Sequence, residues 1–122
     1  MAGPWKQVTG PKSSPGATLH LYQFASPSRN IGCTLGDEDT AYCLTVKPPR
    51  SVSLSHNGRI RVCSGRRCIG SGKFGGTPTL GYGKRDLYAG YLCRSKRVGV
   101  TCVYAKSGKG FLINRNGVKR IG

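Results

Sequence analysis

The chain has 122 residues, with 20 Lys or Arg against four Asp or Glu, so its formal net charge is +16. This length fits one domain, and hydrophobic residues make up only 37% of the chain, so the apolar core must be modest. No run of about 18 apolar residues is present, which excludes a transmembrane helix. A charge this large on so small a body favours an anionic partner.

We expect residues 1–17 to form a flexible N-terminal tail, because they contain three Pro and no periodic apolar pattern. This segment is polar and is not a secretory signal. If the protein is secreted, the chain is therefore expected to be a mature form whose signal has been removed. Residues 18–122 are predicted to form one β-rich domain, which begins with a strand over 18–24.

Two hairpins are predicted around Asn-Gly steps. Residues 51–55 and 59–63 alternate with period two on either side of Asn57-Gly58. Asn116-Gly117 lies between two further β-prone segments, 111–114 and 118–121. Such a step favours a type I′ turn, which needs positive φ at both central positions.

Two more strands are predicted over 91–94 and 98–104, joined by the basic turn 95–97. No stretch of twelve or more residues has a helical period, and Gly and Pro interrupt the chain often. The predicted fold class is therefore all-β, as a small barrel or a sandwich of hairpins in a single domain.

The cysteines favour disulfide bonds. An even number in a short chain with a modest core is typical of disulfides, although six cysteines allow 15 pairings and the sequence alone does not choose among them. If neighbours in sequence pair, each bridge closes one hairpin or loop and contributes roughly 2–3 kcal/mol. No metal site is predicted, because zinc ligands come in two close pairs, whereas here only one pair is close and neither His is at ligand spacing. The six are Cys33, Cys43, Cys63, Cys68, Cys93 and Cys102.

The positive charge is unevenly placed along the chain. Residues 1–46 have three Lys or Arg and three acids, the contiguous Asp37, Glu38 and Asp39, which are expected to form a turn. Residues 47–122 have 17 Lys or Arg against Asp86 alone. The excess therefore belongs to the β-rich part and not to a basic tail.

Motifs for catalysis are weak. The glycines at 70, 72 and 75 fit a dinucleotide-binding pattern, but no helix follows to receive a pyrophosphate, so a mobile hairpin loop over 70–76 is the simpler interpretation. His20 and His56 could act as acid and base in a small basic ribonuclease, which is a second alternative function. No nucleophile motif and no pair of separated carboxylates is present. We predict no enzymatic activity and no cofactor.

Cations alternate with aromatic rings in the second half, a pattern that can bind a charged polymer while the rings stack on it. The predicted partner is an anionic polymer, which is a cell-envelope component, a glycan or a nucleic acid. The alternative is a protein inhibitor or toxin-like effector that presents the 70–76 loop or the 95–97 turn to an acidic protein surface. The predicted ligand-binding residues are Lys84, Arg85, Arg94, Lys96, Arg97, Tyr82 and Tyr88.

Several short motifs resemble a family of small secreted actinobacterial domains of unknown function. They are the segment Ser-Pro-Ser-x-Asn-Ile-Gly-Cys ending at Cys33, then Cys43, Pro48-Pro49, Leu-Gly-Tyr-Gly at 80–83, Gly-x-x-Cys ending at Cys93, Gly-Val-Thr-Cys ending at Cys102, and Gly-x-Gly-Phe ending at Phe111. The resemblance covers about residues 24–115.

The resemblance implies export to an oxidising compartment, the pairs Cys33–Cys43 and Cys93–Cys102, and no catalytic residues. This chain departs from the family in its middle, where a cysteine is expected nearer 50–55. The third bridge, Cys63–Cys68, is therefore predicted from its close spacing alone.

Overall fold

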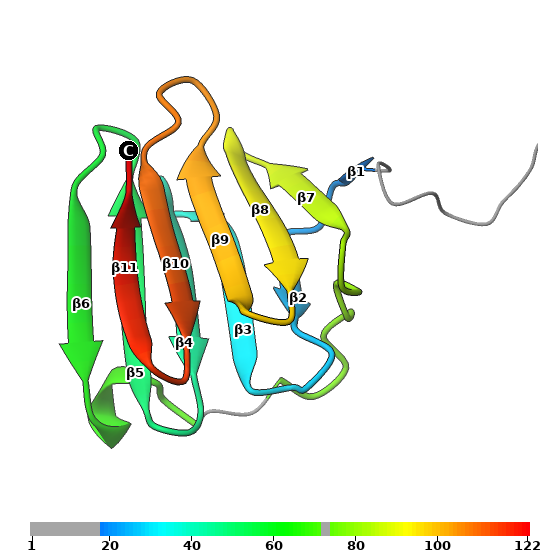
Figure 1. The fold of residues 1–122 in the computed structure, drawn as a ribbon, viewed down its shortest axis with the longest axis vertical. Helices are drawn as coiled ribbons and strands as arrows, with labels where there is room; N and C mark the ends of the chain where they lie inside the picture. The colour runs from blue at the N-terminus through cyan, green and yellow to red at the C-terminus, as the bar shows by residue number, and fades with distance from the viewer. Residues whose placement is uncertain (1–17, 72–73) are drawn as a thin grey trace, which may run out of the picture.

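The computed structural model describes residues 18–71 and 74–122 and has an all-β fold of two sheets packed face to face (Figure 1). The predicted tail over 1–17 lies outside the described residues. Sheet A has the order β1 (Thr18–Leu19), β7 (Arg85–Tyr88), β8 (Tyr91–Lys96), β9 (Gly99–Tyr104), β10 (Gly110–Asn114) and β11 (Gly117–Ile121). Sheet B has the order β2 (Gln23–Ala25), β3 (Ile31–Asp37), β4 (Thr40–Thr45), β5 (Arg50–Ser55) and β6 (Ile60–Ser64). Of the two predicted forms, the structure is the sandwich.

The helical content of the described chain is one 3-10 turn, η1 (Arg66–Cys68). Among the residues that the structure describes, no helix is long and apolar enough to cross a membrane.

The two sheets repeat one topology. Strands β2–β6 and β7–β11 each follow the chain as a five-stranded antiparallel meander, and β1 adds a parallel sixth strand beside β7. In each meander a disulfide joins the second and third strands, and an Asn-Gly step joins the fourth and fifth. Short sequential hairpins explain this architecture, because antiparallel neighbours need only short turns.

The core lies between the sheets and is filled by the inward residues of both. In β4, for example, Ala41, Cys43 and Thr45 are buried, whereas the residues between them are half-buried on the opposite face. The alternation is the period of two expected of a strand with one face on the core. The largest fully buried side chains include Tyr91, Phe24 and Phe111.

All three predicted disulfides are present: Cys33–Cys43, Cys63–Cys68 and Cys93–Cys102. Two of them join directly opposed residues on neighbouring strands and are buried in the core. The third lies at the surface, where it ties the end of β6 to η1.

The hairpins at Asn57-Gly58 and Asn116-Gly117 are confirmed, but their predicted turn type is wrong. Only the glycine of each step has positive φ, 91° in Gly58 and 141° in Gly117. The pair of positive φ values that a type I′ turn needs occurs instead at Glu38-Asp39, between β3 and β4, and at Ala89-Gly90, between β7 and β8. The acidic turn predicted at 37–39 is therefore present as a tight hairpin.

The predicted strand over 18–24 divides between the two sheets. Thr18 and Leu19 pair with β7 in sheet A, and the chain then crosses to sheet B, where Gln23 begins β2. A buried carboxylate holds the crossing, because Asp86 Oδ1 accepts the Leu21 backbone N–H at 2.6 Å. The predicted turn at 95–97 is also shifted, since β8 continues to Lys96 and β9 begins at Gly99.

Ile69 and Phe74, in the segment between η1 and β7, lie against the outer face of sheet B. Ile69 is buried there, and the Phe74 ring fills the space where a side chain of residue 32 would stand. Arg29 lies over the same ring, with its guanidinium carbon 6.0 Å from the centroid. The described part of the predicted 70–76 loop is therefore packed through Phe74, which only a glycine at position 32 permits.

Candidate anion-binding surface

The outer face of sheet A has a row of cations. In β8 the buried residues Tyr91, Cys93 and Ser95 alternate with outward residues, and two of these, Arg94 and Lys96, are exposed cations. The strand register places Arg85 of β7 directly opposite Arg94.

The same register continues across the sheet. Arg94 pairs with Thr101 of β9, and Thr101 pairs with Leu112 of β10. Leu112 in turn pairs with Lys119 of β11. Arg85, Arg94 and Lys119 therefore lie in one cross-strand row, with Lys96 two residues beyond Arg94. We call these four residues the basic face.

A hollow adjoins the basic face at the end of the sandwich where the β8–β9 and β10–β11 turns lie. It has a volume of about 560 Å³, and Lys96 lines it together with Arg97 and Arg115. The Arg97 guanidinium carbon stands 5.0 Å from the centre of the Tyr82 ring, within the range of a cation–π contact. Hydroxyl and amide groups also line it, from Ser26, Ser28, Asn30, Asn114 and Asn116, as do the apolar Ile31 and Val98. We call this the basic hollow, and Lys96 joins it to the basic face.

The structure brings five of the seven predicted ligand-binding residues to this surface: Arg85 and Arg94 on the basic face, Arg97 and Tyr82 in the basic hollow, and Lys96 in both. Lys84 is half-buried and its alkyl chain lies beside Gly81. Tyr88 ends β7 far from the basic hollow and packs edge-on against Tyr22, with 5.8 Å between ring centres.

Two cations of this surface, Arg115 and Lys119, were not predicted from the sequence. The signal for them was present in the second Asn-Gly hairpin. Once that hairpin is accepted, Arg115 must lie in its turn and Lys119 must face the same side as Leu112. What the sequence lacks is the order of strands that brings β11 to the same sheet as β8.

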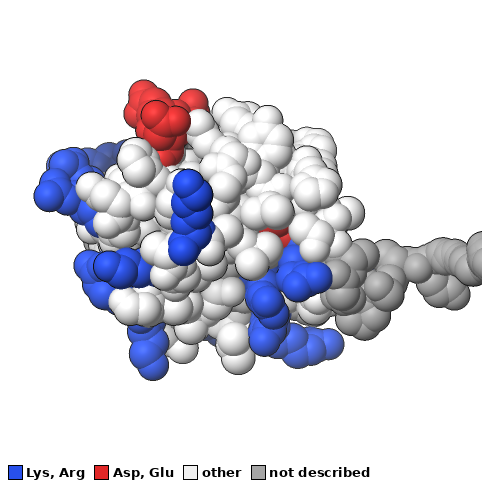
Figure 2. Space-filling view, turned by 90° about the horizontal axis from the view of Figure 1, so that it is seen from above, with Lys and Arg blue, Asp and Glu red and all other residues white. Residues whose placement is uncertain are grey.

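The acidic residues do not neutralise this surface. Asp37, Glu38 and Asp39 are exposed on the β3–β4 turn of sheet B. Figure 2 shows a group of acidic side chains at one corner of the molecule and a small acidic patch right of centre, with Lys and Arg spread over the left, central and lower parts of the view. Asp86, the one acid in residues 47–122, is buried. Of the basic face, Arg94, Lys96 and Lys119 are exposed to solvent, whereas Arg85 is half-buried.

Asp86 is a buried carboxyl with a clearly displaced pKa. Burial raises the pKa of Asp86 from its ordinary value of 3.8 to about 6. The hydrogen bond from the Leu21 N–H and the nearby His20 both lower this pKa, but burial has the larger effect. Its Oδ2 has no hydrogen-bond partner in the described part of the molecule. A shifted carboxyl can indicate catalysis, but this one is enclosed and holds the β1–β2 crossing, so its role is structural.

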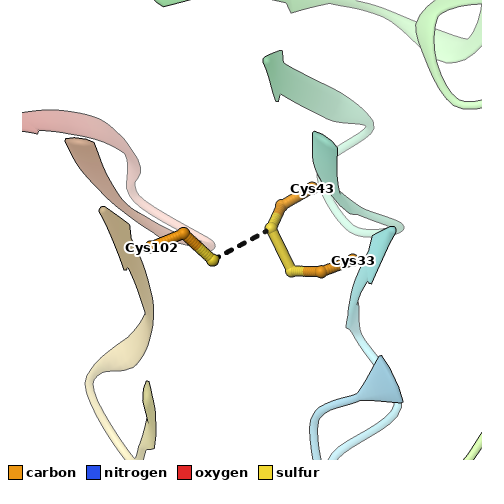
Figure 3. A group of neighbouring side chains, drawn as sticks. All are labelled: Cys33, Cys43 and Cys102. Carbon is orange, nitrogen blue, oxygen red and sulfur yellow. Dashed lines mark hydrogen bonds between the residues drawn. A yellow bond between two sulfur atoms is a disulfide. The ribbon is translucent and has the colours of Figure 1, made fainter. Parts of the chain in front are cut away.

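Within the described part of the chain, three cysteine sulfurs form the one cluster with metal-binding potential, and disulfide bonds occupy them. Cys33, Cys43 and Cys102 have their Sγ atoms within 4.8 Å of one another. Figure 3 shows the Cys33–Cys43 bridge facing Cys102, with 3.7 Å between Sγ of Cys43 and Sγ of Cys102. Zinc binding needs thiolates, whereas these sulfurs are bonded in pairs and fill the centre of the core.

The two histidines of the ribonuclease alternative lie on different sheets. His20 Nδ1 lies 2.9 Å from the Leu87 carbonyl oxygen beside sheet A. His56 lies in the β5–β6 turn, with its ring 6.1 Å from that of Tyr104. His56 lines a small hollow with Tyr91 and Tyr104, and His20 is not among the residues of that hollow.

Comparison with protein-family models, with curated proteins and with solved structures gave no match.

Proposed function

We propose that this protein is a secreted, non-enzymatic module whose basic face and basic hollow bind an anionic polymer. The observation that carries the proposal is the cross-strand row of Arg85, Arg94 and Lys119, continuous through Lys96 with the basic hollow. Arg85 and Arg94 lie directly opposite each other, and like charges at opposed positions lower stability through repulsion. A polymer with regularly spaced negative charges would relieve that repulsion.

Secretion is part of the proposal. Three disulfides support it, because such bonds persist in oxidising compartments. The resemblance to secreted actinobacterial domains is in keeping with it. The polymer would then be an envelope or extracellular component bearing phosphate, sulfate or carboxylate groups.

Binding would be driven by counterion release, and its salt dependence reports the number of contacts. Four contacts, one for each cation of the basic face, give a slope of log K against log salt of about −3.6 on a duplex-like polyanion. Affinity should then fall roughly a hundredfold between about 50 and 200 mM salt. The stacked pair of Arg97 and Tyr82 would add a contact to a ring or sugar that is less sensitive to salt.

A charge reversal on the basic face, compared with one elsewhere, tests the proposal. Arg94→Glu and Arg67→Glu change the net charge equally and both side chains are exposed, but Arg67 lies in η1, away from the basic face. Affinity for heparin, DNA, polyphosphate and teichoic acid would be measured for each variant at several salt concentrations. Thermal unfolding would confirm that both variants are folded.

We expect Arg94→Glu to weaken binding strongly and to reduce the salt slope by about one. Arg67→Glu should have a small effect on both quantities. If the two variants weaken binding equally, net charge alone is responsible and the proposed surface does not exist. Saturable one-to-one binding to an acidic protein, with no binding to polymers, would favour the inhibitor alternative.

A further inference from the structure

The outer face of sheet B differs from that of sheet A in its chemistry. One outward residue of each strand lies directly opposite the next, which gives a row across all five strands. Four of the five are uncharged and can form hydrogen bonds, and the fifth, an arginine, ends the row at the sheet edge. In strand order they are Gln23, Thr34, Tyr42, Ser53 and Arg61.

The chain around this row builds a walled hollow. On one side lies η1, because the Tyr42 hydroxyl donates a hydrogen bond of 2.7 Å to the Cys68 carbonyl oxygen of η1. On the opposite side are the acidic β3–β4 turn and the β5–β6 turn, which contribute Glu38 and Asn57. The space between has a volume of about 720 Å³. We call it the polar hollow.

The lining of the polar hollow consists entirely of residues with hydrogen-bonding side chains. No aliphatic residue lines it, whereas sites for drug-like ligands are predominantly apolar. Its carboxylates, from Asp37 and Glu38, are equal in number to its guanidinium groups, from Arg59 and Arg61. On a chain of net charge +16, this local balance does not favour a polyanion.

We propose that the polar hollow binds an uncharged carbohydrate chain. Each sugar hydroxyl is both a donor and an acceptor, so it requires side chains of both kinds, and amide, hydroxyl, carboxylate and guanidinium groups together supply them. The groups are already close, because Gln23 Nε2 lies 3.5 Å from Thr34 Oγ1. The exposed ring of Tyr22 at one end gives the apolar C–H face of a sugar a surface on which to stack.

The geometry of the row fits a repeating ligand. Neighbouring strands are about 4.8 Å apart, so the side chains of the row are spaced by about the same distance across the sheet. A hexose unit in an extended polysaccharide advances by a similar distance. Successive sugar units can therefore meet successive strands, with the chain running across the strands from Tyr22 toward Arg61.

This site is independent of the proposed anion-binding function. The polar hollow is on sheet B and the basic face is on sheet A, and they share no residue. High salt separates them further, because about 0.5 M NaCl screens the basic face, while hydrogen bonds to an uncharged sugar persist. Either proposal can therefore fail while the other stands.

The experiment is an NMR titration of the ¹⁵N-labelled full chain with uncharged oligosaccharides in about 0.5 M NaCl. The probes are the hexamers of β-1,4-glucose, β-1,3-glucose, α-1,4-glucose, α-1,6-mannose and β-1,4-N-acetylglucosamine. The test variant is Thr34→Val, which removes one hydroxyl from the polar hollow and keeps the shape of the side chain. The control is Thr101→Val, the same change at a half-buried outward position of sheet A.

We expect at least one probe to cause saturable shifts at Gln23, Thr34 and Ser53. Thr34→Val should weaken that binding about tenfold, because it leaves a sugar hydroxyl unpaired, and Thr101→Val should not weaken it. The absence of shifts with every probe at about 10 mM would overturn the proposal. Shifts confined to other parts of the protein, or equal losses in the two variants, would overturn it as well.

Discussion

Asp86 is a buried carboxylate whose ionisation opposes folding. The free-energy difference between a pKa of about 6 in the folded chain and 3.8 in the unfolded chain corresponds to about 3 kcal/mol. Because the folded state holds the proton more tightly, protonation stabilises it. This stabilisation is complete below about pH 4, declines as the pH rises to about 6, and is absent above that pH.

The variant Asp86→Asn should remove this pH dependence. The amide oxygen can still accept the Leu21 N–H, so the β1–β2 crossing keeps its hydrogen bond. The new amide N–H groups are buried and can cost about 1–3 kcal/mol if they find no partner. That cost is the same at every pH, so the stability of Asp86→Asn relative to the native chain should rise by about 2.5 kcal/mol between pH 4 and pH 7.5, because the unfolded carboxyl is already partly ionised at pH 4.

The free energy of unfolding is measured for the native chain and for Asp86→Asn at both pH values. The method is urea unfolding with intact disulfides, followed by circular dichroism. Glu38→Gln serves as the control, because it removes an exposed carboxylate. A difference between native chain and Asp86→Asn that is the same at pH 4 and pH 7.5 would refute the reasoning. It would mean that burial of Asp86 does not disfavour its charge, or that the unfolded chain holds the proton equally well.

Two further predictions concern packing and the disulfides. Gly32→Ala should lower the free energy of unfolding by about 1–3 kcal/mol, because the new methyl group enters the space of the Phe74 ring. Urea unfolding should show that most of this loss disappears in a Phe74→Ala background. An unchanged loss in that background would contradict the contact between residue 32 and Phe74. Mild reduction followed by alkylation should label Cys63 and Cys68 first, because Cys63 is exposed and the other two bridges are buried. Mass spectrometry identifies the labelled cysteines. Equal labelling of Cys33 or Cys102 would contradict this order.

Local patterns in the sequence predicted the fold class, two hairpins and the Cys63–Cys68 bridge, because each depends on residues close together in the chain. The pairs Cys33–Cys43 and Cys93–Cys102 were implied by the family resemblance. The division of residues 18–24 between two sheets was not predictable in this way. It depends on Asp86, which is distant in sequence and whose carboxylate captures the Leu21 N–H. The turn type at the Asn-Gly steps failed for a related reason, since the hairpin register allowed only the glycines to take positive φ.

The candidate surface was predictable only in part. The residues of β7 and β8 are near in sequence, so Arg85, Arg94 and Lys96 could be grouped from the pattern of charges. Lys119 could not, because its place depends on β9 and β10 lying between β8 and β11. The polar hollow had a partial signal, since the predicted Asn57-Gly58 hairpin accounts for Ser53 opposite Arg61. Gln23 and Thr34 join the same row only through the register of β2, β3 and β4.

The two meanders share a topology and differ in their outward residues, which are the residues that both of our proposals use. Inward positions are constrained by the core, so both meanders bury a bridge between their second and third strands. Outward positions can change with little effect on that core, because alternate residues of a strand face opposite sides. In sheet A these positions include Arg94 and Lys96, and in sheet B they include Thr34 and Ser53. Because the fold would tolerate either chemistry on either face, we propose that the difference between the outward residues of the two sheets reflects what each face binds.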